Sequence, residues 1–525
     1  MKTPRLVVLS CALVLAAGPA ASHDLPDRLG KVSFPTSCDP KVQPLFDAAV
    51  AMQHSYWFPE AQKTFNAVLE RDPACAIAYW GLAVNYVGNS LVAPPPPKDV
   101  EAGRNALEKA RAAGAKTQRE RDWIEAISAY YRDHDKIALD QRLAAYSKAM
   151  ERMTERHPGD FEAWVYYALT LQATAPTDDK TYANQRRAAE ILERLVAQNP
   201  QHPGAAHYLV HAYDYPPLAA QGIKIARAYG KLAPAAPHAR HMPSHIYSMV
   251  GLWADSIESN LSALEIQPNY YHAYDFAVYA SLQLAQDARA KSFIDKAMET
   301  YRARGDEPGL NFVFRAALAA LPARYMLERA DWKGASSLPV SSTQFPAADS
   351  LTRFARGLGM ARSGDLAGAK RELEAMQQLG GVLEKSNNQY WADRTREQIL
   401  AVRAWVALAE GDRDQARSSM REAADREDAS VKNVAMENRL YPMRELLAEM
   451  LLELGQPANA LREFEASIQE TPNRYRGLWG AARAAEAAGE QKKAAAYYAN
   501  VIELTKTSDG SRPEIALSKA RIAPQ

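Results

Sequence analysis

The sequence predicts an all-α protein built as a solenoid of helical hairpins. The main observation is a period of 34 residues near the C-terminus, where a glycine, an alanine and an aromatic residue recur. The recurring pairs are Gly455 and Gly489, Ala460 and Ala494, and Phe464 and Tyr498. The chain also lacks βαβ alternation and the motifs G-x-G-x-x-G, G-x-x-x-x-G-K-[ST], G-x-S-x-G and H-E-x-x-H. Rossmann, P-loop, hydrolase and zincin proteins are therefore disfavoured.

The period has a packing explanation. Small residues at fixed offsets let two helices approach, a large apolar residue fills the adjacent gap, and a proline ends the second helix. Near the N-terminus, Ala61, Phe65 and Pro73 are the small residue, the aromatic residue and the closing proline of a second helix. Residues 79–86 supply the first helix of the next repeat. Because each hairpin leaves an apolar face uncovered, neighbouring hairpins must stack.

This pattern resembles the tetratricopeptide repeat (TPR), W-x2-L-G-x2-Y…A-x3-F…P. The resemblance implies a right-handed α-solenoid of TPR-like helical hairpins over most of residues 41–520. Second helices of hairpins are expected to begin near Glu60, Ala458 and Lys492. Breaks between hairpins are expected at residues 93–98, 173–179 and 339–348.

The first 22 residues have the composition of a secretory signal. Lys2 and Arg5 form a basic start, and an apolar run of 12 residues follows at 6–17. Residues 20–22 then offer a small-residue cleavage site, so we expect secretion to the periplasm or the extracellular space. No later segment reaches 18 uncharged apolar residues, so no membrane span is expected.

We expect the whole chain to divide into five segments. The segments are a signal peptide (1–22), an N-terminal extension (23–40), an N-terminal solenoid (41–335) with histidine-rich repeats at 203–300, a linker (336–350) and a C-terminal solenoid (351–525) with a capping helix at 513–522.

Composition narrows the possible partners. The 525 residues include 63 basic and 62 acidic ones, a formal net charge of +1, so nucleic-acid binding through a broadly basic surface is disfavoured. With 47% hydrophobic and 24% charged residues the chain is ordinary globular material. Only three cysteines exclude a disulfide-dense scaffold. In an oxidising compartment, Cys38 and Cys75 either form a disulfide or remain two independent buried thiols.

Histidine is strongly clustered. Seven of the 11 histidines lie within residues 202–272, where a uniform spread would place about 1.5. Prolines at the repeat-closing position predict repeats that begin near residues 203, 237 and 271. His207 and His211 then share two repeat positions with His241 and His245, one period later. The i, i+4 spacing places each pair on one helix face.

In TPR proteins these positions face the concave groove, so the resemblance implies that both pairs point into it. Imidazoles from adjacent helices, about 8–10 Å apart, could then meet around one ion. The sequence predicts a divalent-metal site of His207, His211, His241 and His245, with zinc or copper as the metal that suits imidazole. Supporting or groove positions are predicted for His238, His272, Asp214, Asp275 and Tyr279. The lone His54 is expected to be ordinary groove lining.

Pro243 leaves two alternatives for this site. It either kinks a helix that runs from residue 237 or starts a shorter helix at 243. In the second case His238 and His241 lie on a preceding loop and lose their spacing to His245.

The strings H-Y-x-x-H at His207 and H-M-P-S-H-I-Y at His241 are similar to those of an exported bacterial group of TPR proteins. That resemblance implies the fold and points to the histidines, and it implies no reaction. The function predicted here is an exported scaffold that binds a protein or peptide in its concave groove and carries a histidine-rich metal site. Two alternatives remain: a metal-dependent enzyme that uses the same histidines, or an assembly scaffold without metal.

Overall fold

The structure, a computed structural model, is all-α in the part of the chain that it describes, as predicted. The described residues are 28–89, 95–305, 311–340, 342–386, 388–430, 439–510 and 512–522. The predicted signal peptide (1–22) lies outside them, as do the first residues of the predicted extension. No helix in the described ranges is both long enough and apolar enough to cross a membrane.

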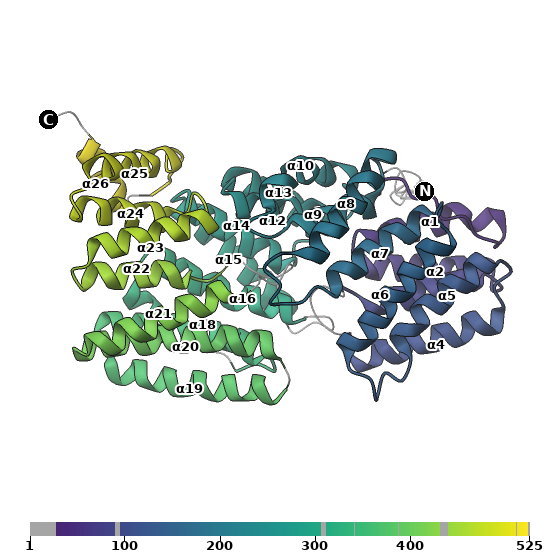
Figure 1. Ribbon diagram of the computed structural model, residues 1–525, viewed down its shortest axis with the longest axis horizontal. Coiled ribbons are helices and arrows are strands. Elements are labelled where there is room, and N and C mark those ends of the chain that lie inside the picture. Colours follow the sequence, from purple (N-terminus) through teal and green to yellow (C-terminus); the bar gives the residue numbers. More distant parts are fainter. Residues whose placement is uncertain are drawn as a thin grey trace, which may run out of the picture.

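The helices follow one another as antiparallel hairpins (Figure 1). Those of the N-terminal part are η2 (Pro40–Val42), α1 (Gln43–His54), α2 (Phe58–Arg71), α3 (Ala76–Val87), α4 (Pro97–Ala113), α5 (Gln118–Tyr131), α6 (Leu139–Arg156), α7 (Phe161–Ala173) and α8 (Ala183–Gln198). The histidine-rich repeats form α9 (Pro203–Tyr213), η3 (Ala219–Gly222), α10 (Ile223–Leu232), α11 (Pro237–His241), α12 (Pro243–Val250), α13 (Trp253–Ile266), α14 (Tyr271–Gln283) and α15 (Asp287–Arg304).

The C-terminal part continues the same pattern. Its helices are α16 (Phe312–Glu328), α17 (Trp332–Ser336), α18 (Pro346–Ser363), α19 (Leu366–Lys385), α20 (Gln389–Glu410), α21 (Arg413–Ala429), α22 (Met443–Glu453), α23 (Pro457–Glu470), α24 (Tyr475–Ala487), α25 (Gln491–Leu504) and α26 (Pro513–Ile522). Residues 513–522, predicted to be a capping helix, form the helix α26. The division at residues 336–350 and the right-handed sense of the solenoid stay predictions.

The repeat positions pack as the period predicts. Gly81 lies in α3 so close to the ring of Phe65 in α2 that a Cβ atom would come within 2.3 Å of it. Gly480 in α24 has the same relation to Phe464 in α23, at 2.2 Å. Glycine is therefore required at both positions because an aromatic side chain occupies the space next to its Cα.

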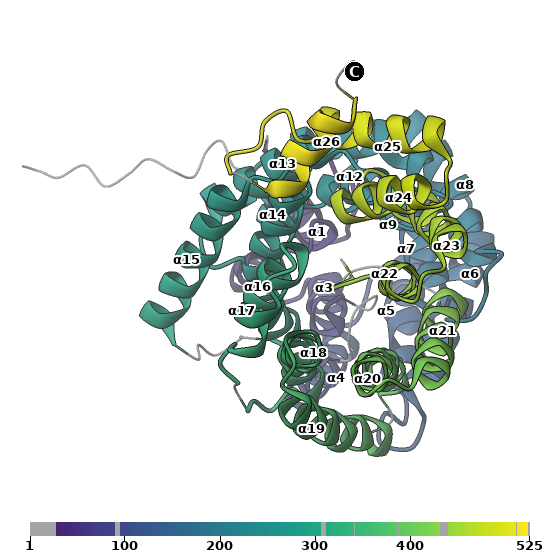
Figure 2. The same cartoon turned by 90° about the vertical axis from the view of Figure 1, so that its left-hand side faces the viewer.

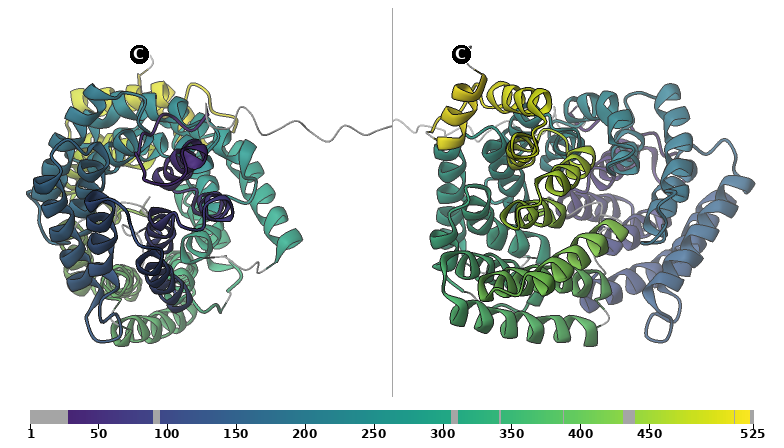
Figure 3. Two further views of the ribbon diagram at one scale, coloured as in Figure 1. Left: turned by 90° about the vertical axis from the view of Figure 1, so that its right-hand side faces the viewer. Right: turned by 60° about the vertical axis from the view of Figure 1, so that its left-hand side comes forward.

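The solenoid curls until its C-terminal helices contact its middle. Viewed end-on, α14 to α26 form a ring in which α24 contacts α14 (Figure 2). The N-terminal helices curve in a similar way when seen from the opposite end (Figure 3). Trp253 Nε1 donates to the Asn473 carbonyl at 2.8 Å, and the Tyr475 amide donates to Gln283 Oε1 at 2.9 Å. These contacts close the ring.

A buried ion cluster strengthens this closure. The Arg474 guanidinium contacts Glu328 at 2.8 Å and Glu445 at 2.8 Å, and it donates to the Tyr279 hydroxyl at 2.8 Å. Arg474 and Glu328 are fully buried, so removing either partner would leave an uncompensated charge in the interior. The cluster ties α14, α16, α22 and α24 together.

Cys38 and Cys75 form a disulfide bond, with their Cα atoms 4.9 Å apart. The bond links the segment before η2 to the residue that precedes α3. Of the two alternatives that the sequence left open, the structure adopts the paired one.

Candidate metal centre

Six histidines meet in the interior between α9, α11, α12 and α14. Their candidate ligand nitrogens form two groups of three, and within each group these atoms lie within 4.8 Å of one another. We call the groups triad A (His207, His211 and His238) and triad B (His241, His245 and His272). The sequence predicted one ion held by four of these rings. The structure instead divides those four between two groups and adds a third imidazole, His238 or His272, to each.

Two imidazoles of triad A are oriented by hydrogen bonds to a backbone carbonyl and a tyrosine hydroxyl. His207 Nδ1 donates to the His54 carbonyl at 2.6 Å, which leaves its Nε2 with a lone pair. That Nε2 lies 3.1 Å from Nε2 of His238, whose Nδ1 is 2.9 Å from the Tyr270 hydroxyl. The ring of His211 lies 4.7 Å from that of His207, measured between centroids.

Triad B is anchored by an amide and a carboxylate. His241 Nδ1 donates to Asn260 Oδ1 at 2.6 Å, and His245 Nδ1 donates to Asp214 Oδ2 at 2.8 Å. The Nε2 atoms of His241 and His245 lie 2.9 Å apart. The ring of His272 completes the group, with centroid distances of 4.7 Å to His241 and 5.7 Å to His245.

The hydrogen bonds of triad B direct two Nε2 atoms at each other. Both Nδ1 atoms face oxygen acceptors, and the Asn260 amide nitrogen is turned away to donate to the Ser256 carbonyl at 2.7 Å. Each neutral ring therefore presents an Nε2 lone pair, and the two lone pairs of His241 and His245 face each other. A proton shared between these two Nε2 atoms would bridge two rings, whereas a metal ion could bind the third imidazole, that of His272, as well.

Burial favours the neutral form of three of these imidazoles, those of His207, His238 and His241. Four of the six side chains are 0–2% exposed, and His272 is 6% exposed. Desolvation lowers the pKa of His207 to about 3, although its bond to the His54 carbonyl opposes the shift. Desolvation also lowers the pKa values of His238 and His241 well below 6.5, and neighbouring imidazoles lower them further. At neutral pH these three rings therefore offer lone pairs to a metal ion.

Pro243 does not disrupt the site. It begins α12, as one alternative predicted, but His238 and His241 lie on the short helix α11 and not on a loop. Met242, between the two helices, nevertheless has the helical angles φ −52° and ψ −36°. The chain thus continues as one turn through the junction, and His241 keeps its i, i+4 relation to His245.

A third cluster supports triad A from behind. Glu162 Oε2 contacts His54 Nε2 at 2.8 Å, and its Oε1 contacts His202 Nε2 at 2.7 Å. Burial alone would raise the pKa of Glu162, but the two imidazoles hold it well below its usual value. Because the carboxylate already engages both Nε2 atoms, this cluster is a hydrogen-bonded support. His54, expected to line the groove, is instead fully buried, and its carbonyl orients His207.

A cavity of about 480 Å³ reaches both triads. Among the rings that line it are His211 and His238 of triad A and His245 and His272 of triad B. Its wall also includes aromatic side chains, which are Tyr56, Phe58, Tyr86, Tyr270, Phe312 and Phe314. The volume lies in the range of small-molecule sites.

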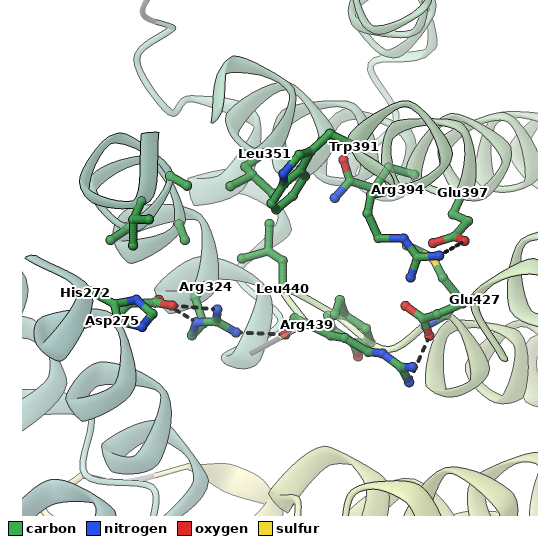
Figure 4. Close-up of a pocket in the computed structure, with 17 residues that line it drawn as sticks. His272, Asp275, Arg324, Leu351, Trp391, Arg394, Glu397, Glu427, Arg439 and Leu440 are labelled. Carbon is green, nitrogen blue, oxygen red and sulfur yellow. Dashed lines mark hydrogen bonds and ion pairs between the residues drawn. The ribbon is translucent and has the colours of Figure 1, made fainter. Parts of the chain in front are cut away.

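The predicted supporting residues separate in the structure. Asp214 lies directly behind His245, whereas Tyr279 hydrogen-bonds to Arg474 in the ring-closing cluster and does not join the triads. Asp275 forms an ion pair with Arg324 at 3.1 Å (Figure 4). Asp275 and Arg324 line a small cavity of about 60 Å³, and His272 also lines it. Asp275 and Tyr279 therefore pair with arginines, and their predicted groove positions stay a prediction. On α14, His272 completes triad B, and the ring of Phe276 packs against His241 and His245.

Sequence reasoning missed the hydrogen-bond partners of the site. Glu162, Asn260 and Tyr270 come from α7, α13 and the residue before α14, and they reach the imidazoles only through tertiary packing. No spacing rule links Glu162 to His202, 40 residues later. The sole sequence signal was the rarity of glutamate in an otherwise apolar first helix of a hairpin, α7.

No protein-family model matches the chain, and no curated protein matches it. Among solved structures it is similar to that of Naa15/Naa10 bound to HypK-THB, with 14% identity, a TM-score of 0.25, and coverage of 92% of this chain and 72% of the other. It is also similar to a human IFIT1 dimer with m7Gppp-AAAA, with 12% identity, a TM-score of 0.37, and coverage of 82% and 90%.

Proposed function

We propose that this chain is an exported, TPR-like helical protein that holds one metal ion in each histidine triad. The observation that supports it is the facing Nε2 pair of His241 and His245, 2.9 Å apart, with both Nδ1 atoms committed to oxygen acceptors. Four-coordinate metal ions bound at about 2.0–2.1 Å separate neighbouring ligand nitrogens by roughly 3.3 Å. Small movements of the rings would therefore admit an ion.

The donor set favours copper. Both triads consist of neutral imidazoles, which suit zinc and copper, and copper binds such sites more tightly. A copper(I) ion also brings one positive charge into the interior where zinc brings two, so its desolvation costs less. The carboxylate of Asp214 faces Nδ1 of His245 and not the Nε2 pair.

The disulfide supports the predicted export. Disulfides persist in the periplasm and outside the cell, whereas cytosolic reductants keep thiols reduced. The Cys38–Cys75 bond is therefore consistent with a chain that leaves the cytoplasm through the predicted signal at residues 1–22.

Metal content of the protein tests the proposal. Mature protein, purified without a histidine tag and loaded with copper, should retain two equivalents by elemental analysis. The double variant His207→Ala/His211→Ala should retain one, held by triad B, and His241→Ala/His272→Ala should retain one, held by triad A. His157→Ala is the matched control, because that histidine pairs with Asp122 away from the site at 2.9 Å.

Copper retention that is equal in all four proteins, or absent from the unaltered one, would overturn the proposal. Circular dichroism of each variant separates loss of ligands from loss of fold. The predicted binding of a protein or peptide in the groove stays a prediction, as does the assembly scaffold without metal.

A further inference from the structure

We infer that the two triads form one coupled dicopper centre that oxidises a small, neutral aromatic diol with dioxygen. The inference rests on the proposed function, since it needs an ion in each triad. It adds that the two ions act together, and it names a substrate class for the cavity.

The triads are close enough for their ions to share a ligand. The rings of His211 in triad A and His245 in triad B have centroids 6.3 Å apart. Those of His238 and His241, one from each triad, are 6.1 Å apart. Ions bound about 2 Å from the nitrogens of such neighbouring rings would be neighbours themselves. A pair of ions at about 3.5–4 Å can hold one oxygen species between them.

Charge favours a centre that alternates between copper(I) and copper(II). The six imidazoles carry no negative charge, and Asp214 behind His245 supplies a single buried carboxylate, so the desolvation cost of two ions is lowest when both are reduced to copper(I). Dioxygen is an uncharged oxidant that can enter an apolar cavity and remove electrons from the reduced pair. The ligand set thus suits reaction with oxygen better than hydrolysis by a permanently divalent pair.

The cavity selects an uncharged aromatic molecule. Rings from both triads open onto it, so a molecule bound there would reach both ions. The aromatic side chains Tyr56, Phe58 and Phe312 in its wall suit stacking with a flat ring. Among the described residues that line it there is no lysine or arginine, and Asp99 adds a carboxylate, so a phosphate or carboxylate substrate would find no countercharge.

The reaction balances with dioxygen as the oxidant. Each diol loses two electrons and two protons as its two O–H bonds break, and it becomes a quinone. The copper pair carries these electrons two at a time. One dioxygen accepts four electrons and four protons, its O–O bond breaks, and two water molecules form. Two diols are therefore consumed for each dioxygen.

Magnetic resonance and oxygen uptake test the inference on copper-loaded full-length mature protein. With two copper(II) ions bound, coupling through a shared oxygen ligand should reduce the EPR intensity far below that of the copper present. His241→Ala/His272→Ala, with one copper, should restore the full signal of one ion. With catechol as the probe, the unaltered protein should consume one dioxygen per two catechols, and the single-triad variants should fall to the rate of free copper.

A cavity variant separates substrate access from metal binding. Val313 lines the cavity, and Val313→Trp should leave the copper content and EPR signal unchanged while raising the KM for catechol about tenfold. Val340→Trp, at a 40% exposed valine, is the matched control and should change nothing.

The outcomes separate the two proposals. Two bound coppers with full EPR intensity, or with catechol oxidation no faster than free copper, would overturn the dicopper oxidase and leave the metal-binding proposal standing. Failure to retain copper would overturn the proposed function itself.

Discussion

Asp214 hydrogen-bonds to His245 on the side of the ring opposite the Nε2 atom. Its carboxylate accepts a hydrogen bond from Nδ1 at 2.8 Å, the Asp214 side chain is fully buried, and that of His245 is 2% exposed. The bond fixes the tautomer of His245, so that Nε2 carries the lone pair directed at His241. A carboxylate in this position also raises the basicity of the imidazole toward a metal ion.

Asp214→Asn should therefore weaken one of the two copper sites. The amide keeps the shape but loses the negative charge, and changes to such supporting residues lower metal affinity about 10–100-fold. Titration against a copper chelator measures the loss. Asp122→Asn, which alters the similar contact with His157 away from the site, should leave both affinities unchanged. Equal affinities for both variants would contradict the role assigned to Asp214.

Gly81→Ala should destabilise the fold. The added Cβ would lie 2.3 Å from the Phe65 ring, so α2 and α3 must move apart, at a cost of about 1–3 kcal/mol. The urea midpoint followed by circular dichroism reports this. Gly381→Ala in α19 is the control, because nothing lies within 4 Å of its Cβ position. It should be neutral or stabilising by up to about 1 kcal/mol. A similar loss at both positions would refute the packing explanation.

Glu449→Gln should destabilise the protein at neutral pH and less so in acid. Burial raises the pKa of Glu449, but Arg476 and Arg362 outweigh it, and the net pKa lies well below 4.5. The ionised carboxylate therefore contributes stability above pH 4.5 that is lost as the pH falls toward the lowered pKa. The substitution leaves the guanidiniums of Arg476 and Arg362 without the Glu449 carboxylate, which should lower the free energy of unfolding by about 3 kcal/mol at neutral pH.

Urea unfolding between pH 3 and pH 7 measures this dependence of the Glu449→Gln effect. Glu125→Gln removes an exposed pair with Arg132 and should change stability by less than about 1 kcal/mol. A Glu449→Gln effect that does not change with pH would show that charge is not its cause.

Cys38→Ser/Cys75→Ser should lower stability by about 4 kcal/mol in oxidising conditions. The two cysteines are 37 positions apart, and a cross-link of that length removes loop entropy of this size from the unfolded chain. Thermal unfolding with and without a reductant provides the measurement. In reductant the two proteins should unfold alike, and a difference that persists there would point to packing of the sulfurs instead.

The sequence identified the repeats because their packing rule is local. Repeat starts expected near 203, 237 and 271 coincide with the first residues of α9, α11 and α14, and the capping helix lies at 513–522 as predicted. Each of these positions is set by a proline or by small residues within about one period, so a single sequence contains the whole signal.

The candidate site was only partly accessible from the sequence. The clustering of histidines and the repeat period located the region of His207, His211, His241 and His245. They could not show that these four rings form two separate groups, each completed by a third imidazole, that of His238 or His272. The separation of Asp275 and Tyr279 from the histidines depends on Arg324 and Arg474, which lie about 50 and 195 residues away in sequence.

By itself the sequence determined the helical-hairpin repeat, its period, and the stretch of chain where imidazoles concentrate, because these follow from interactions between residues near one another in the chain. Only the tertiary structure decided which rings meet, which tautomers their partners impose, and that the solenoid closes on itself through contacts such as Trp253 with Asn473. The curvature that brings such distant residues together is the sum of small rotations over many repeats, and no local pattern encodes that sum.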